Sequence, residues 1–160
     1  MVKVVKFGGS SLASAEQFKK VGNIIRAEES RRYVVPSAPG KRFSEDTKVT
    51  DMLYKCYAEG EEGKNFDKSL KAIKERYNEI IKGLGLKLSL EEQFETIKKQ
   101  FAAKAGKDYA ASRGEYLNGI IMANYLGYEF IDAATVICFD KNGEFESEKT
   151  NQVMSERLAN

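Results

Sequence analysis

The first eleven residues constrain the fold of this chain most, because they run from an extended pattern through two glycines into a helical pattern. Three valines within residues 2–7 are β-branched and favour an extended backbone, so this run is predicted to be a strand. Gly8 and Gly9 end the run. Apolar residues then recur at helical spacing over residues 14–29. A strand, a glycine turn and a helix N-terminus are therefore predicted in immediate succession.

Such a junction is suited to holding a phosphate group. Glycines allow the backbone to approach a ligand closely, and the N–H groups and dipole of a helix start favour an anion. Lys6, at the end of the predicted strand, adds a positive charge. An ordinary tight turn between a strand and a helix explains the same residues, and this alternative stays open. The turn is not a Walker A loop, because no Gly-Lys-Ser/Thr follows, and G-x-G-x-x-G is absent too.

The rest of the chain alternates in a way typical of an α/β protein. A second strand is predicted at residues 33–35, and a loop rich in turn-forming residues follows it. A strand, a helix and a strand in this order indicate a parallel βαβ unit. Apolar residues at helical spacing predict further helices at about residues 47–59, 66–81, from 89 onward, 112–126 and 150–158.

Local signals predict where several of these elements begin and end. Ser14 is expected to cap the first long helix, with Gln17 three residues on, and Ser89 to cap a later one. Gly60 is expected to break the helix before it, and Gly127 to follow the end of another. Two short extended pieces and a hairpin turn complete the prediction, at residues 129–131, 135–139 and 140–143.

Composition excludes several function classes. The 160 residues suit one domain, 42% of them are hydrophobic, and the net charge of +2 gives no electrostatic case for binding nucleic acid. The absence of histidine excludes a Cys/His zinc site and a Ser-His or Cys-His nucleophile. Cys56 and Cys138 are interpreted as reduced, buried side chains of a cytoplasmic protein. No apolar run approaches the roughly 20 residues of a membrane span.

The run Lys6-Phe7-Gly8-Gly9-Ser10-Ser11 resembles the opening motif of the aspartokinases, in the amino-acid kinase family. Three further stretches agree in the family's order. Residues 34–40 look like the loop after the second strand, residues 48–53 like the next helix start with its Thr-Asp pair, and residues 112–117 like the Ser-x-Gly-Glu helix start. Four motifs in order are far more specific than one, and the resemblance covers essentially all 160 residues.

The resemblance implies a fold, an activity and a set of site residues. The implied fold is a three-layer α/β/α sandwich around a mainly parallel sheet. The implied activity transfers the γ-phosphate of ATP, carried with Mg²⁺, to the side-chain carboxylate of L-aspartate, the first step of lysine, threonine and methionine biosynthesis. The residues carried over for the ATP phosphates are Lys6, as the catalytic residue, with Phe7, Gly8 and Gly9; those for aspartate are Ser37, Thr50 and Glu115. No residue is carried over as a metal ligand.

Other roles for the three aspartate-site residues stay open. Ser112 and Glu115 form a Ser-x-x-Glu pattern, which also describes a capping box at a helix start. Thr50 alone is compatible with a helix-surface hydroxyl, and Ser37 with a turn residue. The chemistry itself needs no general base, because an aspartate side chain with a reference pKa near ~3.9 is already ionised at neutral pH.

The resemblance also predicts what the chain contains. Residues 1–160 are expected to be the N-terminal, aspartate-binding portion of the kinase domain, with the nucleotide-binding half and the regulatory domains further along. The complete enzyme is expected to be a homo-oligomer, and the isolated chain to be inactive. The alternatives are a non-catalytic aspartate-binding or dimerising fragment, and a kinase for another small acid of the same superfamily.

Overall fold

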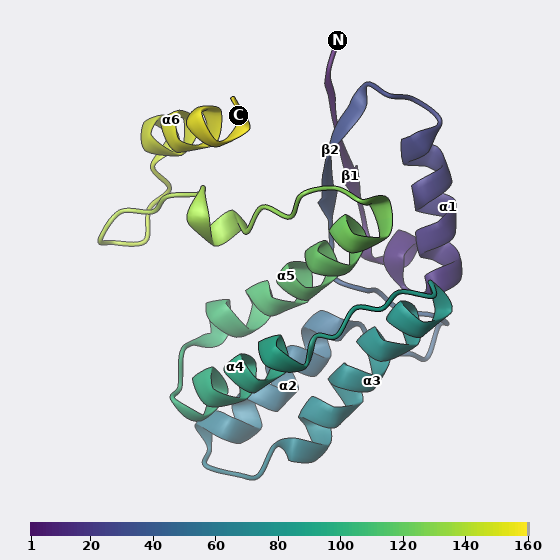
Figure 1. The fold of residues 1–160 in the computed structure, drawn as a ribbon. Coiled ribbons are helices and arrows are strands. Elements are labelled where there is room, and N and C mark those ends of the chain that lie inside the picture. Colours follow the sequence, from purple (N-terminus) through teal and green to yellow (C-terminus); the bar gives the residue numbers. More distant parts are fainter. Residues whose placement is uncertain (160) are drawn as a thin grey trace. The chain divides into compact units, whose positions relative to one another are not determined.

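The computed structural model describes residues 1–159 and divides the chain into two compact units (Figure 1). The first unit comprises Met1–Tyr128, and the second begins at Glu129. The first contains both strands and the hydrophobic core, so it carries the candidate site.

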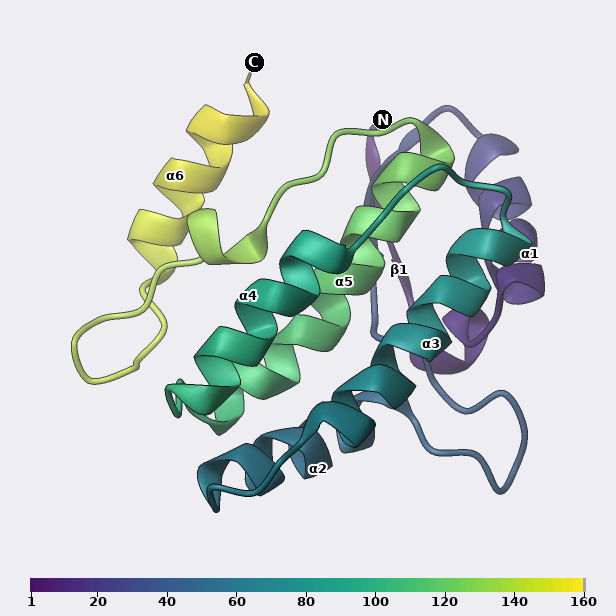
Figure 2. The same cartoon turned by 60° about the horizontal axis from the view of Figure 1, so that its bottom comes forward.

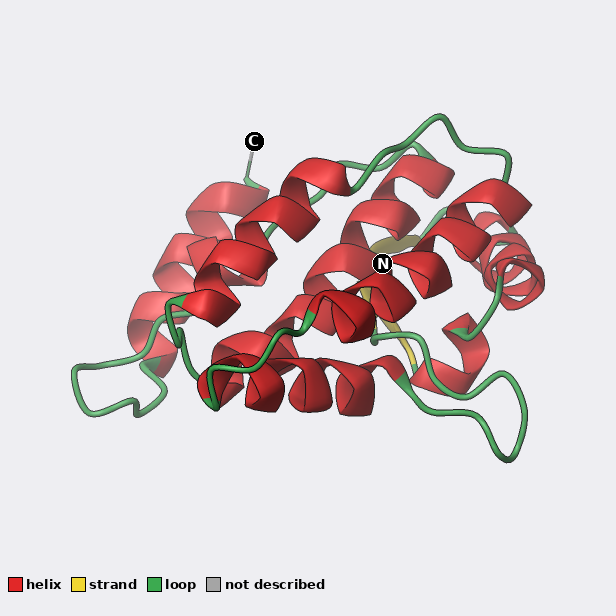
Figure 3. Ribbon diagram, turned by 90° about the horizontal axis from the view of Figure 1, so that it is seen from below, coloured by secondary structure: helices red, strands yellow, loops and turns green. Residues whose placement is uncertain are grey.

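The first unit opens with the predicted βαβ arrangement. Strand β1 (Lys3–Phe7) and strand β2 (Arg31–Pro36) pair in parallel, and helix α1 (Ala15–Arg26) connects them. In the register of the sheet, Phe7 lies opposite Pro36, so both strands end at the same edge. These are the strands of the sheet within the described residues, and helices make up most of the remaining structure (Figure 3). The parallel βαβ unit is confirmed.

Only one face of this small sheet packs against the core. Val5, Phe7 and Val34 contact the buried cluster, whereas Val4 and Val35 on the opposite face are 67% and 47% exposed. Burial alternates along each strand because successive side chains point to opposite faces of the sheet. The arrangement fits an α/β fold that is represented here by its N-terminal portion.

The start of α1 follows the sequence signal. Gly9–Leu12 form a 3₁₀ turn directly after the strand. Ser14 has an extended backbone, and its hydroxyl accepts a hydrogen bond from the backbone N–H of Gln17 at 3.3 Å. The predicted N-cap is therefore confirmed.

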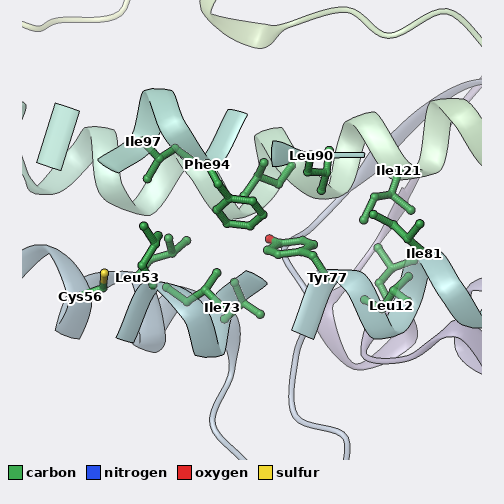
Figure 4. Close-up of a cluster of buried hydrophobic side chains, with 14 of the residues drawn as sticks. Leu12, Leu53, Cys56, Ile73, Tyr77, Ile81, Leu90, Phe94, Ile97 and Ile121 are labelled. Carbon is green, nitrogen blue, oxygen red and sulfur yellow. The ribbon is translucent and has the colours of Figure 1, made fainter. Parts of the chain in front are cut away.

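Four further helices complete the first unit (Figure 2). They are α2 (Val49–Glu61), α3 (Asp67–Gly83), α4 (Glu91–Ala102) and α5 (Lys107–Leu126). Apolar side chains are buried between them. In the core, Tyr77 of α3 faces Phe94 of α4 with ring centroids 6.1 Å apart (Figure 4). Tyr57 of α2 and Phe101 of α4 make an edge-to-face contact with ring centroids 5.4 Å apart.

Two predicted N-caps are wrong. Helix α5 begins at Lys107 rather than at Ser112, because Gly106 supplies a backbone with φ of 112° just before it. Ser112 therefore lies inside the helix, where its hydroxyl donates to the carbonyl of Tyr109 at 2.7 Å. The N-cap of α4 is Leu90, while the preceding Ser89 hydroxyl accepts from the N–H of Glu91.

Two predictions about glycines have opposite outcomes. Gly60 does not break α2 but lies buried inside it, where an added Cβ would meet the ring of Phe66 at 3.1 Å. Gly127 follows α5 in the left-handed conformation with φ of 73°, as predicted for a residue that ends a helix.

The second unit contains one helix, α6 (Ser147–Leu158), within its described residues. The predicted hairpin turn is confirmed by an antiparallel bridge between Phe139 and Phe145, and the Asp140 carboxylate accepts from two backbone N–H groups inside the turn. The predicted extended pieces are not strands, and Ala133–Thr135 form a 3₁₀ turn instead. Two hydrogen bonds to Asp132 stabilise this turn. The N–H of Ala134 donates to its carboxylate, and the Thr135 hydroxyl donates to its carbonyl.

The predicted burial of the cysteines is confirmed for one of the two residues. Both are free thiols, but only Cys56 is buried, whereas Cys138 is half-buried. Burial raises the pKa of the Cys56 thiol to about 12, so it stays protonated. Within the described residues, no helix combines the length and hydropathy that a membrane span requires.

Candidate active site

The carboxyl ends of the two strands bring Lys6 and Ser37 together. The Lys6 ammonium lies 3.5 Å from the Ser37 hydroxyl, although the two residues are distant in sequence. The backbone N–H of Ser37 donates to the carbonyl of Phe7 at 3.0 Å, which continues the strand pairing beyond β2. Lys6 is exposed and Ser37 half-buried, so both side chains can reach a ligand.

The glycine turn after β1 packs directly against the loop after β2. The N–H of Gly40 donates to the carbonyl of Gly9 at 2.8 Å. A Cβ on Gly40 would lie 2.6 Å from the carbonyl carbon of Gly9, and one on Gly9 would lie 2.9 Å from the carbonyl oxygen of Ala38. No atom lies within 4 Å of a Cβ built on Gly8. Gly9 and Gly40 are therefore required by a close backbone approach, whereas Gly8 is not.

Helix α5 packs against the segment that contains Ser37, and it also carries Glu115. Fully buried Asn118 donates from its amide nitrogen to the carbonyl of Ser37 at 2.7 Å. A Cβ on Gly114 would come within 2.7 Å of the Ala38 side chain, so this glycine allows α5 to lie against the loop. Glu115 follows directly in the helix and is exposed.

The Tyr77 hydroxyl strengthens this support. It donates to the carbonyl of Gly114 at 2.8 Å, inside the core. Burial, together with the negative charge of nearby Glu115, holds the pKa of Tyr77 well above its usual range. Tyr77 therefore remains a neutral hydrogen-bond donor to the helix that carries Glu115.

Thr50 lies in the first turn of α2, half-buried. The N–H of the preceding Val49 donates to the carbonyl of Pro39 at 3.0 Å, so the start of α2 is tied to the loop after β2. Within the described residues, Thr50 and Glu115 make no hydrogen bond with Lys6 or Ser37. The structure thus joins Lys6, Gly9 and Ser37 through direct contacts and attaches the elements that carry Thr50 and Glu115 to the same loop.

Two residues at this site were not predicted from the sequence. Asn118 lies three residues after Glu115, and its only sequence signal is a polar side chain inside an otherwise apolar helical stripe. Arg76 gives the same signal in α3 between Ile73 and Tyr77, which are both buried. A buried polar residue usually holds a specific partner, and both residues bind carbonyls of the loop after β2.

A cavity of about 390 Å³ lies beside this site, between α2 and α3. Thr47 and Asp51 line it, but Lys6, Ser37, Thr50 and Glu115 do not. Within the part of the chain that the structure describes, no three His, Cys, Asp or Glu side chains cluster in a way that could hold a metal ion.

The parallel βαβ unit, with a lysine and a glycine turn at its carboxyl edge, defines an α/β protein. The chain belongs to the amino acid kinase family, because the model of that family matches residues 1–160. The fold class expected from the sequence is confirmed by this match and by the structural neighbours.

Curated relatives of the chain are aspartokinases. Aspartokinase 3 of Bacillus subtilis (strain 168) is 36% identical over 141 residues, which cover 84% of this chain and 31% of that protein. Aspartokinase 1, chloroplastic, of Arabidopsis thaliana is 32% identical over 133 residues, which cover 77% of this chain and 23% of that protein. The chain therefore spans about a third of the length of the first relative and less of the second.

Solved structures agree with this assignment. The aspartate kinase of Clostridium acetobutylicum superimposes with a TM-score of 0.93 at 50% identity, over 97% of this chain and 36% of that one. The E. coli aspartokinase III in complex with aspartate and ADP superimposes with a TM-score of 0.78 over 99% of this chain and 38% of that one. At 20% identity, this second likeness shows the fold alone.

Proposed function

We propose that this chain is the aspartate-binding portion of an aspartate kinase, which transfers the γ-phosphate of ATP to the side-chain carboxylate of L-aspartate. The observation that carries the proposal is the approach of Lys6 to Ser37 beside the contact between Gly9 and Gly40. It puts a cation, a hydroxyl and a glycine turn at one edge of the sheet. The match to aspartokinases over most of the chain supports this reading.

In this proposal, the end of β1 binds the transferred phosphate. Phosphoryl transfer depends mainly on positioning and on stabilising negative charge. The Lys6 ammonium would neutralise the oxygens of the phosphate in flight, so Lys6 is the proposed catalytic residue. Phe7, Gly8 and Gly9 would contribute backbone contacts to the same phosphate. The close packing of Gly9 on Gly40 keeps this backbone in place.

The aspartate substrate would lie between the loop after β2 and the helices that follow. The hydroxyls of Ser37 and Thr50 can donate to its carboxylates, and the Glu115 carboxylate can pair with its ammonium group. The capping alternative for Glu115 no longer applies, because α5 begins at Lys107. Glu115 is therefore an exposed carboxylate without a role in starting its helix.

Different observations support ATP as the phosphate donor and Mg²⁺ as its metal ion. The E. coli relative was solved with aspartate and ADP, and we propose ATP as the phosphate donor here. Mg²⁺ would arrive with ATP, because this ion is held largely by substrate phosphates and water. The described residues offer no acidic cluster for it, so none is assigned as a ligand. We further propose that the enzyme is cytoplasmic and homo-oligomeric, and that it acts in lysine biosynthesis.

Replacing Lys6 by alanine in the intact gene product tests the proposal. We expect kcat to fall by about a hundredfold or more while the KM for aspartate changes little, because Lys6 acts on the phosphate in the transition state. Lys3→Ala is the matched control, since Lys3 lies in the same strand but pairs with Glu28 at its other end. An unchanged kcat in Lys6→Ala would show that Lys6 is only structural.

A substrate panel separates aspartate from the other acids of the superfamily. Initial rates with aspartate, glutamate and UMP would be measured on the same preparation. We expect phosphorylation of aspartate alone, because the Thr50-Asp51 pair and the Ser112–Glu115 motif resemble those of aspartokinases rather than those of kinases for glutamate or UMP. A preference for glutamate or UMP would overturn the substrate assignment and leave the kinase class intact.

A further inference from the structure

The guanidinium of Arg76 is buried in the first unit although arginine is rarely buried without a specific role. Arg76 lies on the inner face of α3 and is only 4% exposed. Its neighbours along that face, Ile73 and Tyr77, are fully buried core residues. Burying a cation costs free energy unless it is paired and hydrogen-bonded, so the contacts of this side chain explain its presence.

Arg76 binds both ends of the loop between β2 and α2. One terminal nitrogen donates to the carbonyl of Gly40 at 2.8 Å. The other donates to the carbonyl of Thr47 at 2.9 Å and lies 3.3 Å from the Asp46 carboxylate. Residues 41–45, between these two ends, are all exposed, and the loop projects beyond the helices (Figure 2). One rigid side chain therefore closes the base of the loop.

Each end of this loop leads directly to a part of the candidate site. Gly40 donates to the carbonyl of Gly9 in the proposed phosphate turn. Thr47 lies just before the first turn of α2, which carries Thr50 and is tied back to Pro39 through the N–H of Val49. Arg76 therefore bonds to both chain segments that lead to the candidate site, at Gly40 and at Thr47.

Among the basic residues, only arginine can bind the carbonyls of Gly40 and Thr47 at the same time. Its planar guanidinium presents several donors in a fixed geometry, so it can bind two carbonyls at once. A lysine ammonium is a point charge on a flexible stem, and a methionine would fill the space without donating. Arg42 binds the same Asp46 carboxylate from the exposed side, but it reaches neither loop carbonyl.

We propose that Arg76 is a positioning residue, which joins Gly40 to Thr47 and so holds Ser37 and Thr50 at the spacing that an amino dicarboxylic acid requires. The proposal rests on the assignment of the site to aspartate phosphorylation. Arg76 does not touch the substrate; it acts through the loop carbonyls. Its loss would therefore weaken aspartate binding more than it slows phosphate transfer.

Amide hydrogen exchange on the 160-residue chain tests the structural part without reference to activity. In Arg76→Met, the N–H groups of Gly40 and Val49 should exchange at least about tenfold faster, because their hydrogen bonds depend on the closed loop. The N–H of Phe94 in α4 serves as an internal reference and should not change. Arg42→Gln is the matched control, since it removes an ion pair to Asp46 but leaves the two carbonyl contacts.

A second variant distinguishes the loss of the two carbonyl contacts from misfolding. Arg76→Lys keeps the charge and most of the volume, and we expect intermediate exchange rates because one ammonium spans two carbonyls poorly. Unchanged rates at Gly40 and Val49 in both variants would overturn the proposal. Equal acceleration at Phe94 would overturn it too, since Arg76 would then support the whole core.

Steady-state kinetics of the intact gene product test the functional part. Arg76→Met should raise the KM for aspartate by roughly tenfold, with kcat and the KM for ATP within about twofold of the parent values. Arg76→Lys should recover part of the loss, and Arg42→Gln should match the parent. An unchanged KM for aspartate in Arg76→Met would overturn the positioning role. If Arg76→Met loses its loop protection but the parent protein does not phosphorylate aspartate, the structural role of Arg76 stands and the proposed function is contradicted.

Discussion

At the scale of single residues, the Asp46 carboxylate links the exposed and buried arginines of the loop. Arg42 binds it through two nitrogens at 2.7 Å and 3.0 Å, and Arg76 approaches it at 3.3 Å. The hydrogen bonds from Arg42 and the charge of Arg76 hold the pKa of Asp46 far below its usual range, although burial opposes this shift. Glu79, the other carboxylate of the cluster, pairs with Arg42 at 3.0 Å.

The lowered pKa makes the contribution of Asp46 to stability depend on pH. The folded pKa lies below the unfolded value of about 3.9, so the stabilisation is complete above pH 4 and is lost as pH falls through the folded pKa. We expect Asp46→Asn to lower the free energy of unfolding by about 1–3 kcal/mol at neutral pH. Urea unfolding at pH 7 and near pH 3 checks this, and a difference that stays constant would contradict it.

The two glycines in mutual contact should tolerate substitution far less than their neighbour. Gly40→Ala would place a Cβ 2.6 Å from the backbone of Gly9, so we expect a loss of about 1–3 kcal/mol in the free energy of unfolding. Gly8→Ala is the control, because Gly8 has φ of −78° and open space around it. Denaturant unfolding of both variants makes the comparison. Equal losses would show that the contact matters little for stability.

At the scale of elements, two similar local signals had different outcomes. Ser14 and Ser112 both begin a pattern that resembles a capping box. Ser14 caps α1 because the residues before it form a separate turn. Ser112 does not cap α5, because the five residues from Lys107 onward already continue the helix upstream. Whether such a serine caps a helix depends on what precedes it, and the pattern does not contain that information.

The two serines therefore make a matched pair for measurement. Ser14→Ala should lower the free energy of unfolding by about 1 kcal/mol through the lost N-cap. Ser112→Ala should change it by less than about 0.5 kcal/mol, because the hydrogen bonds that it loses, to Tyr109 and from Arg113, are exposed to solvent. Thermal unfolding of the 160-residue chain reports both values. A larger effect at Ser112 would restore the capping interpretation.

At the scale of the whole molecule, the main cluster of buried hydrophobic side chains among the described residues lies in the first unit. Its buried cluster extends from Leu12 to Met122. The sheet packs against this core through one face only, with Val4 and Val35 exposed on the other. The expected three-layer arrangement is thus represented here by a parallel sheet and the helices on one of its faces.

The isolated 160-residue chain is expected to release ADP at a negligible rate in the presence of ATP and aspartate. The chain corresponds to 36% of the Clostridium acetobutylicum kinase, and the resemblance puts the nucleotide pocket in a later part of such enzymes. Restored activity is expected when this chain replaces the matching segment of that kinase. A coupled ADP assay on both proteins decides, and turnover by the isolated chain at an ordinary enzyme rate would contradict the prediction.

The sequence by itself determined the features that depend on near neighbours. β-branched residues before a glycine pair predicted β1 and its turn, helical spacing predicted the helices, and Ser14 predicted a cap. The family motifs supplied a set of candidate site residues, which stays a prediction. Of these, the structure brings Lys6 to Ser37, as expected from two parallel strands that end at one edge.

Only the tertiary structure decided how these parts are held together. The contact of Gly9 with Gly40, the bond from Asn118 to Ser37 and the closure of the loop by Arg76 all join residues far apart in sequence. Such contacts arise from the packing of α3 and α5 against the loop after β2, which local propensity does not encode. The strand and glycine turn were predicted from eleven residues, whereas the side chains that hold the turn in place were not.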